Sequence, residues 1–316
     1  MRKTLRRHNK RNKTKKKLIN SNNRVTNPQI YNEDGLSLLK KLEDGSVDLV
    51  LTDPPYIISN SETGLNQIAL KVKNYKKTGE MYKTQKQWEE YKTQKEWDEW
   101  MDKKNIPDSK REKKLEEIKK NYMKYGTIYG SKYGITTDYG DWDSKFTIKD
   151  LNEFIKEYFR VLKNGGTVII FFDIWKLCIL KDILVENGFK QVRFIEWIKT
   201  NAQPLNSSLN YLTNNREIAL VAVKHSKGTF NSSYDNGIYN YPIYTGKDRF
   251  HPTQKNVKLF EHLIKKHSNV GDMVVDTFLG SGTTAIASKN MKRNFIGSEK
   301  NSEFFDKIIK INFCCS

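Results

Sequence analysis

The chain has 316 residues, of which 37% are hydrophobic and 29% are charged, and its formal net charge is +19. It contains no apolar run long enough for a transmembrane helix, and no apolar segment follows the basic N-terminus, so neither a membrane span nor a secretory signal is expected. Three cysteines, two of them adjacent, are too few for a disulfide framework or a zinc site. This composition predicts an intracellular protein, cytoplasmic if bacterial.

Much of the positive charge lies in one segment. The first 17 residues hold ten of the 56 lysines and arginines and no acidic residue. We expect residues 1–28 to form a disordered basic tail that attracts nucleic acid non-specifically, because Lys and Arg release counterions from a phosphate backbone. A nuclear or DNA-targeting signal in another host is the alternative.

The next segment predicts a turn, a short helix and a strand that ends at a charged side chain. The helix is expected over Gly35–Leu42, and the buried strand is VDLVLT, Val47–Thr52. Asp53 therefore follows the carboxyl end of a strand, which is where ligands bind in α/β sheets.

Two prolines and a tyrosine follow this aspartate. Pro54 and Pro55 stiffen the backbone and have no N–H to donate, so their carbonyl oxygens add acceptors beside the Asp53 carboxylate. A site with many acceptors and few donors suits an exocyclic amine, which has two N–H groups to give. The ring of Tyr56 offers a flat surface on which a base can stack.

Residues 59–143 break the pattern of a compact domain. They contain the tandem nonapeptides YKTQKQWEE and YKTQKEWDE, and they are rich in Lys, Glu and Gln. We expect a charged helical insertion without a core of its own. Nine residues make two and a half helical turns, so Trp88 and Trp97 are predicted on opposite sides of one straight helix rather than in a stack. A nucleic-acid clamp is the alternative interpretation.

Strands and helices then alternate to the end of the chain, which predicts a mostly parallel sheet covered by helices on both faces. The glycines of KNGG, Lys163–Gly166, are expected to cap the first of these helices. Residues 225–250, rich in Gly, Asn, Ser and Tyr, are expected to form a long loop that is either functional or disordered. The expected helices are 148–162, 175–188, 257–267, 282–291 and 302–311, and the expected strands are 167–173, 190–199, 216–224, 273–278 and 293–299.

A glycine motif follows one of the last strands. VVDTFLGSGTTAIA places Gly280, Ser281 and Gly282 between a strand and a helix, where glycines let the backbone approach a ligand closely. Glu299 ends the next strand, about where an acid binds ribose hydroxyls in dinucleotide folds. This spacing predicts a ligand that carries adenosine. A third glycine and a P-loop lysine are both absent from the motif, which disfavours a dinucleotide fingerprint and an NTPase.

Together, TDPPY and DTFLGSGTT resemble the catalytic and cofactor motifs of S-adenosylmethionine-dependent DNA amino-methyltransferases. Their order along the chain resembles the β group of that family, and NEDGLSLL, RVLKNGGTVIIFF, WIKTN, HPTQK and RNFIGSE extend the likeness. The resemblance implies a circularly permuted Rossmann-like α/β fold, with residues 29–316 as the methyltransferase domain. It also implies a short target-recognition region near residues 225–250. Two residues depart from the family pattern, Thr277 in place of a proline and Ser298 in place of an aliphatic residue.

The resemblance also implies roles for individual residues. The catalytic segment would be Asp53, Pro54, Pro55 and Tyr56, with no metal. Glu299 would hold the ribose hydroxyls, Asp34 would contact the adenine of the cofactor, and Thr253 and Lys255 would lie near its methionine end. The remaining cofactor-binding residues would be Asp276, Phe278, Gly280, Ser281, Gly282 and Thr283.

The expected reaction is methyl transfer from S-adenosylmethionine to adenine N6 in double-stranded DNA, after the base is flipped out of the helix. In the family, Asp rather than Ser at the first motif position favours adenine over cytosine N4. Cytosine N4, an RNA or protein amine, and an inactive DNA-binding homologue are the alternatives. The resemblance also allows for a cognate restriction endonuclease as a partner.

Overall fold

The computed structural model describes residues 27–57, 71–72, 74–130, 146–202, 215–225, 227–251 and 253–312. The chain divides into two compact units, one formed by residues 1–54 and 148–316 and the other by residues 55–147. Residues 1–26 of the predicted basic tail, and both ends of the predicted insertion, lie outside the described residues. No helix in the described ranges is long and apolar enough to cross a membrane.

A single eight-stranded sheet organises the first unit, in the order β1-β8-β7-β2-β3-β5-β4-β6. All neighbouring pairs are parallel except the two that involve β5, which runs against both β3 and β4. The mostly parallel sheet predicted from the sequence is therefore confirmed. The strands are β1 Gln29–Tyr31, β2 Val47–Thr52, β3 Leu162–Phe172, β4 Phe189–Lys199, β5 Arg216–Lys224, β6 Ile238–Tyr241, β7 Met273–Asp276 and β8 Asn294–Ser298.

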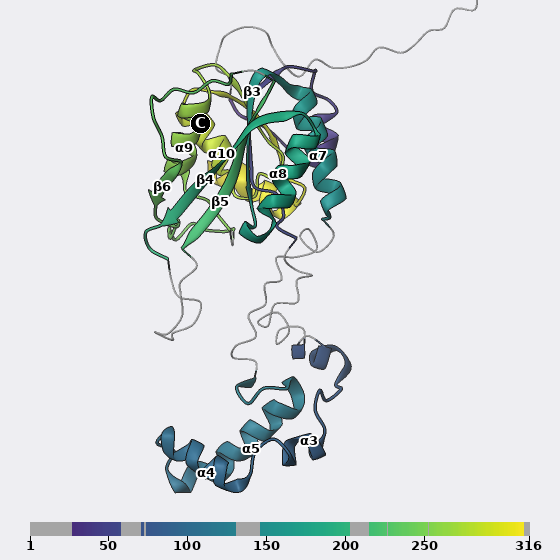
Figure 1. Ribbon diagram of the computed structural model, residues 1–316, viewed down its shortest axis with the longest axis vertical. Coiled ribbons are helices and arrows are strands. Elements are labelled where there is room, and N and C mark those ends of the chain that lie inside the picture. The colour runs from purple at the N-terminus through teal and green to yellow at the C-terminus, as the bar shows by residue number, and fades with distance from the viewer. Residues whose placement is uncertain are drawn as a thin grey trace, which may run out of the picture. The chain divides into compact units, whose positions relative to one another are not determined.

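Helices cover both faces of this sheet (Figure 1). One layer contains α7 and α8, and α1 packs against α7. The other contains α9 and α10, whose apolar side chains join those of the central strands and Ile308 of α11 in one buried cluster. The helices are α1 Gly35–Leu39, α7 Ile148–Val161, α8 Leu177–Glu186, α9 Val257–His267, α10 Thr283–Asn290 and α11 Ser302–Asn312, with a 3-10 turn, η2, at Ile174–Lys176.

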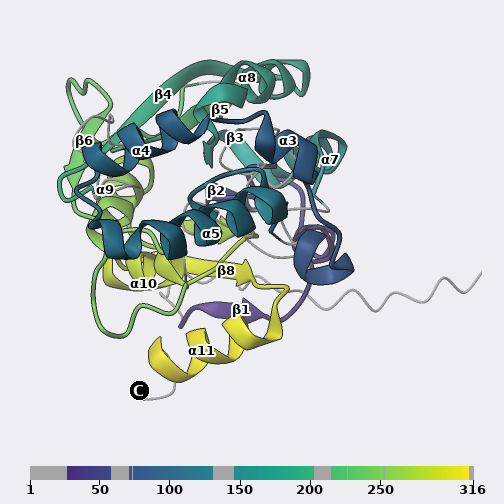
Figure 2. The ribbon, with the colours of Figure 1, turned by 90° about the horizontal axis from the view of Figure 1, so that it is seen from below.

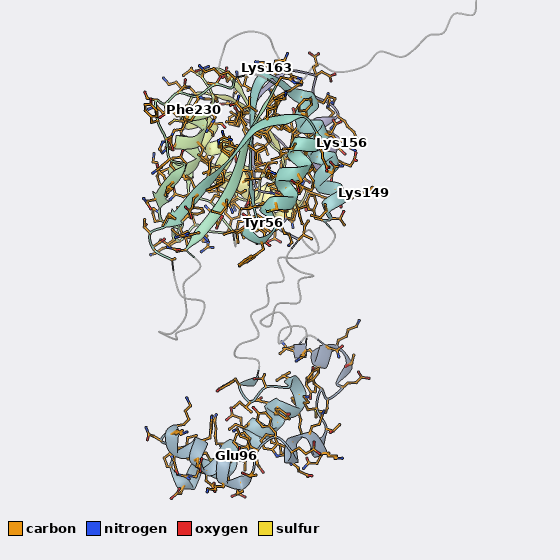
Figure 3. All side chains as sticks on the ribbon, viewed as in Figure 1. Tyr56, Glu96, Lys149, Lys156, Lys163 and Phe230 are labelled. Atoms are coloured by element: carbon orange, nitrogen blue, oxygen red, sulfur yellow. The ribbon has the colours of Figure 1, made fainter. Side chains whose placement is uncertain are left out.

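The strands follow from residue type. β2 and β3 lie inside the sheet, and their runs VDLVLT and TVIIFF are almost wholly buried, as expected for strands covered on both faces. Charged residues mark the amino edge of the sheet. The ammonium of Lys163, near the start of β3, lies 2.7 Å from the carboxylate of Asp48. Lys163 is labelled in Figure 3. Lys149 and Lys156 of α7 lie on the outside of the helical layer in the same view.

Strand β1, the first described strand, pairs with β8, the last strand in sequence, in parallel register (Figure 2). Tyr31 lies opposite Ser298, and the backbone N–H of Glu299 donates to the carbonyl of Tyr31 at 3.0 Å. Segments far apart in the sequence thus meet at one edge of the sheet.

Two predictions about this unit were wrong in detail. Lys163–Gly166 do not cap a helix, because β3 begins at Leu162, directly after α7, and Gly165 takes a φ of 82° within the strand. The segment 225–250 is not wholly a loop either. Its residues Ile238–Tyr241 form β6, which extends the sheet beside β4 because its backbone groups complete that edge.

The helices of the second unit include α3 Gln85–Glu89, α4 Gln94–Lys103 and α5 Asp108–Tyr125. Each nonapeptide begins its own helix. The hydroxyls of Thr84 and Thr93 accept hydrogen bonds from the backbone N–H three residues on. In turn, the side chains of Gln87 and Glu96 accept from the backbone N–H of the two threonines. These are two capping boxes, which fix a helix start and therefore separate α3 from α4. Glu96 is labelled at the start of α4 in Figure 3.

The break between α3 and α4 overturns the prediction made for the tryptophans. Trp88 and Trp97 stack with ring centroids 5.1 Å apart and an interplanar angle of 25°. They form an aromatic core with Ile118 and Tyr122 of α5, and both indoles are almost fully buried. The prediction of one straight helix was wrong because TQKQ and TQKE each start a new helix. The expectation that this segment lacks a core was also wrong, because the separated helices bring the two indoles together.

Candidate active site

The two predicted motifs meet at the carboxyl edge of the sheet. β2 and β7 are neighbours, with Leu49 opposite Val274 and Val50 opposite Val275. The hydroxyl of Thr52, the last residue of β2, donates to Asp276 Oδ1 at 2.7 Å across 224 positions of sequence. Asp53 leaves β2 directly after this contact, so it lies beside the strand that leads into the glycine motif.

Asp276 is a buried carboxylate held by three donors. Thr52 Oγ1 and the Phe278 N–H donate to Oδ1, and Thr284 Oγ1 donates to Oδ2 at 2.5 Å. Burial raises the pKa of Asp276 to about 6, against the lowering effect of these hydrogen bonds. Asp276 therefore ties β2, the loop after β7 and helix α10 into one fixed edge.

The glycine turn has the backbone that its sequence predicts. Gly280 and Gly282 take φ values of 55° and 82°, in the left-handed region that favours glycine. Gly282 is the residue before α10, and the hydroxyls of Ser281 and Thr283 lie 2.9 Å apart on either side of it. A side chain at position 280 would contact the ring of His251, so this histidine forms the opposite wall of the turn.

Glu299 approaches the same turn from β8. Its Oε2 accepts from the Gly280 N–H and its Oε1 from the Asn301 N–H, both at 2.8 Å. Burial raises the pKa of Glu299 although these backbone bonds favour its charged form. Each oxygen keeps a further lone pair, so the carboxylate can still accept hydrogen bonds from ligand hydroxyls.

Asp34 has a local structural role, which is separate from its predicted contact with the adenine of the cofactor. It is the N-cap of α1, where Oδ1 accepts from the Leu36 N–H at 3.0 Å, and Lys300 lies 3.2 Å from Oδ2. Gly35 follows it, and a methyl group there would come within 2.8 Å of Thr277 and Phe154. Asp34 is thereby fixed close to the loop that begins the glycine motif.

The HPTQK segment brings Lys255 to Asp53. The Lys255 ammonium is buried and lies 2.8 Å from Asp53 Oδ2 and 2.7 Å from Glu217 Oε2. Thr253 instead packs on His251, whose Nδ1 lies 3.2 Å from its hydroxyl. Burial, with help from Lys255 and Arg249, lowers the pKa of His251 to about 4, so this ring is neutral at pH 7.

Glu217 was missed by the sequence reasoning. It is the second residue of β5, and a lone acid at the start of an apolar strand carries no distinctive signal. The signal that could have found it is the reversed direction of β5, which brings the start of this strand to the edge where β2 and β4 end.

Both departures from the family pattern lie in this region. Thr277 contacts Tyr158, with their hydroxyl oxygens 2.6 Å apart in the buried interior. Ser298 is fully buried, and within the described part of the chain its hydroxyl has no hydrogen-bond partner. Neither change removes a charged group from the site. The described residues contain no group of three or more His, Cys, Asp or Glu placed to hold a metal ion.

The backbone is unusual directly after the TDPPY segment. Pro54 and Pro55 are buried and Tyr56 is partly exposed. Ile57 takes a φ of 58°, which β-branched side chains rarely adopt. Strain of this kind is often found at functional sites.

Comparison with known proteins places these features in a family. The family model described as DNA methylase, of the N6/N4 type, matches residues 126–310. The chain belongs to the DNA methylase family. Similar proteins include the Type II methyltransferase M2.DpnII of Streptococcus pneumoniae, 33% identical over 189 residues that cover 54% of this chain and 70% of the relative. The Type II methyltransferase M2.MboI of Moraxella bovis is 34% identical over 185 residues, covering 53% and 67%.

Solved structures agree with this assignment. The M1.HpyAVI–SAM complex is 26% identical, with a TM-score of 0.54, and the match covers 89% of this chain and 97% of that one. The PvuII cytosine-N4-specific DNA methyltransferase matches with a TM-score of 0.56 at 16% identity over 93% of this chain and 89% of that one, which shows the fold alone. This DNA methyltransferase thus has the Rossmann-like methyltransferase fold expected from its sequence, and S-adenosylmethionine is its methyl donor.

Proposed function

We propose that this DNA methyltransferase transfers a methyl group to the N6 amine of adenine in double-stranded DNA. The observation that carries the proposal is the contact between Thr52 and Asp276, which sets the acceptor-rich Asp53 segment beside the glycine turn. A direct transfer between two bound molecules requires them to lie close together. This requirement is met when the group that binds the target amine and the turn that binds the cofactor follow adjacent strands.

The residues at this edge fit S-adenosylmethionine. The glycine turn lets the backbone approach the donor closely, Glu299 keeps lone pairs for the ribose hydroxyls, and Asp276 fixes the turn. Within the described residues, Gln254 Oε1 in the HPTQK segment is buried without a hydrogen-bond partner, which leaves an acceptor for a ligand. We further propose cofactor-binding roles for Asp34, Thr253, Phe278, Ser281 and Thr283.

Asp53 and the carbonyl of Pro54 act on the target amine. The nitrogen lone pair of adenine is delocalised into the ring, so this amine is a poor nucleophile. Hydrogen bonds from both amine protons to these two acceptors favour a tetrahedral nitrogen with a localised lone pair. Bound S-adenosylmethionine supplies a methyl group on a sulfonium, an already activated leaving group. Asp53 can then take the proton that the methylated nitrogen releases and pass it to solvent.

Tyr56 is proposed to stack on the base once it is flipped out of the duplex. The left-handed backbone at Ile57 turns the chain directly after this ring. Removing a base from the stack costs a few kcal/mol, and an aromatic partner recovers part of that cost.

Other parts of the chain are proposed to contact DNA. The candidates are the basic tail 1–28, the insertion 59–143 and the region near 225–250, with residues 29–316 forming the methyltransferase domain. Two of the relatives are Type II methyltransferases, which favours a role in restriction-modification with a cognate restriction endonuclease as a partner.

The base assignment has a direct test. DNA from a host that lacks DNA methylation is incubated with the protein and labelled S-adenosylmethionine, digested to nucleosides and separated. We expect the label in N6-methyladenine because the acceptor at position 53 is a carboxylate. Label found only in N4-methylcytosine would overturn the adenine assignment, and parallel reactions with RNA and with bulk protein should remain unlabelled.

The Glu299→Gln variant tests the cofactor site. The amide keeps the size of the side chain but replaces one charged acceptor with a donor, so binding of S-adenosylmethionine should weaken by about 10- to 100-fold, the value of a hydrogen bond to a charged group. Calorimetry measures this affinity. The matched control is Glu303→Gln, which alters an acid on the surface of α11 that pairs with Lys307 and should not change binding. Equal affinities for the two variants would contradict the assignment of Glu299.

A further inference from the structure

Four charged side chains form a row that ends at Asp53. Lys199 Nζ lies 2.7 Å from Glu217 Oε1, Lys255 Nζ lies 2.7 Å from Glu217 Oε2, and the same ammonium lies 2.8 Å from Asp53 Oδ2. Each of the four side chains is at most one-fifth exposed. The signs alternate, so the row carries no net charge when all four groups are ionised.

The sheet explains why these residues meet. Lys199 ends β4 and Asp53 follows β2, so both lie at the carboxyl edge. Glu217 lies near the start of β5, which is reversed, and its register places Glu217 opposite Trp197 of β4. Because β5 runs in the opposite direction, its first residues lie at the carboxyl edge, where a parallel strand would have its last residues. Glu217 is therefore placed between the ends of β2 and β4.

Electrostatics favours the charged forms of Lys255 and Glu217, the two central groups of the row. Burial alone would lower the pKa of Lys255, but Asp53 and Glu217 hold it above its ordinary value. Burial alone would raise the pKa of Glu217, but Lys255 and Lys199 hold it below its ordinary value. A buried charge with one partner removed is costly, so the members of the row depend on one another.

We propose that Glu217 and Lys199 are positioning residues that hold the Lys255 ammonium in a fixed direction on Asp53, and that this ammonium keeps the Asp53 carboxylate charged when it accepts the target amine. The inference rests on the proposed role of Asp53 as that acceptor. Lys255 thereby acts on the catalytic carboxylate, a role distinct from the cofactor contact expected from its place in HPTQK.

The other charged groups near Asp53 decide in which direction its pKa would change if Lys255 were removed. Asp276 on β7 lies close enough that Asp53 contributes to raising its pKa, and His251 is neutral at pH 7. Without Lys255, Asp53 would face the carboxylates of Glu217 and Asp276 with Lys199 as the remaining cation of the row. The pKa of Asp53 would then rise, because nearby like charges and burial both disfavour its charged form.

The experiment measures the single-turnover rate of methyl transfer to unmethylated DNA against pH. In Lys255→Met the acidic limb of the profile should move upward by about 1–3 pH units, the usual effect of losing a close opposite charge. In Glu217→Gln the limb should move downward, because a negative charge has been removed, and the rate on the plateau should fall, because the Lys255 ammonium is no longer held in a fixed direction. In the double variant Lys255→Met/Glu217→Gln the limb should return toward that of the unmodified protein.

Controls separate this effect from loss of structure or of cofactor. Lys258→Met removes an exposed ammonium of α9 that pairs with Glu261, and should leave the limb in place. Calorimetric binding of S-adenosylmethionine and the circular dichroism spectrum are recorded for every variant. If Lys255→Met fails to fold, the downward shift in Glu217→Gln still decides, since a purely structural role for Glu217 moves no limb.

An unshifted limb in both single variants would overturn the inference, as would a double variant with the profile of Lys255→Met alone. The failure of the proposed function is distinct from these results. If Asp53→Ala retained its methyl-transfer rate, Asp53 would not be the acceptor. If Asp53→Ala were inactive while the acidic limbs of Lys255→Met and Glu217→Gln stayed in place, Asp53 would still be the acceptor. The positioning role of the row would then be wrong.

Discussion

Replacing Asp53 with alanine should lower the rate of methyl transfer by about 10³-fold, because the loss of a positioned acceptor typically costs 10²- to 10⁴-fold. The amine would keep the Pro54 carbonyl as its partner but lose the carboxylate that favours a localised lone pair. Binding of S-adenosylmethionine should change little, because the glycine turn and Glu299 follow β7 and β8 rather than β2. The measurement is single-turnover transfer of labelled methyl to DNA, with calorimetric binding of the cofactor beside it.

The matched control for this variant is Asp44→Asn. Asp44 also flanks β2, but it lies before the strand, is largely exposed and pairs with Arg160. It should keep full activity. Retention of most methyl transfer by Asp53→Ala, or loss of transfer together with loss of cofactor binding, would contradict the proposed division of labour between the two motifs.

Replacing Trp97 with alanine should destabilise the helical unit of residues 55–147 by about 3–5 kcal/mol, the usual cost of truncating a buried aromatic side chain. Trp97 is 3% exposed and stacks on Trp88, and this core has few other members to close the cavity. A unit with so small a core has little stability to lose, so we expect its helices to unfold while the sheet unit stays folded.

Limited proteolysis of the full-length chain measures this effect. New cleavage should appear within residues 74–130, and binding of S-adenosylmethionine should persist, because Glu299 and the glycine turn lie in the other unit. The control is Lys95→Ala, an exposed change on the same helix that should leave the digestion pattern unchanged. Resistance of Trp97→Ala to cleavage would show that the aromatic core does not hold these helices together. Sequence preference measured on the same variant then tests whether the unit takes part in DNA recognition.

The sequence predicted the sheet well because its strands are buried runs. VDLVLT, REIALVAVK and MVVD stand out as apolar runs between polar turns. Asp53, Gly280 and Glu299 were identified because each follows a strand end, a position that local sequence can indicate.

The remaining features depend on pairing that local sequence does not encode. β6 is a short strand, IYNY, with one buried residue, and only its partner β4 defines it. The contacts of Lys255 with Asp53 and Glu217 link three separate segments, so no window of sequence contains them. The break between α3 and α4 could have been predicted, because both capping boxes are visible in the sequence.

Those capping boxes have a consequence for how this segment can change in length. Because each nonapeptide carries its own start signal, repeating it adds a corner and a new short helix instead of lengthening an existing one. The tryptophan arrives at the same place in every copy, so each added corner also brings its own apolar contact. A chain that gains further copies of the repeat is therefore expected to start a new helix at each copy.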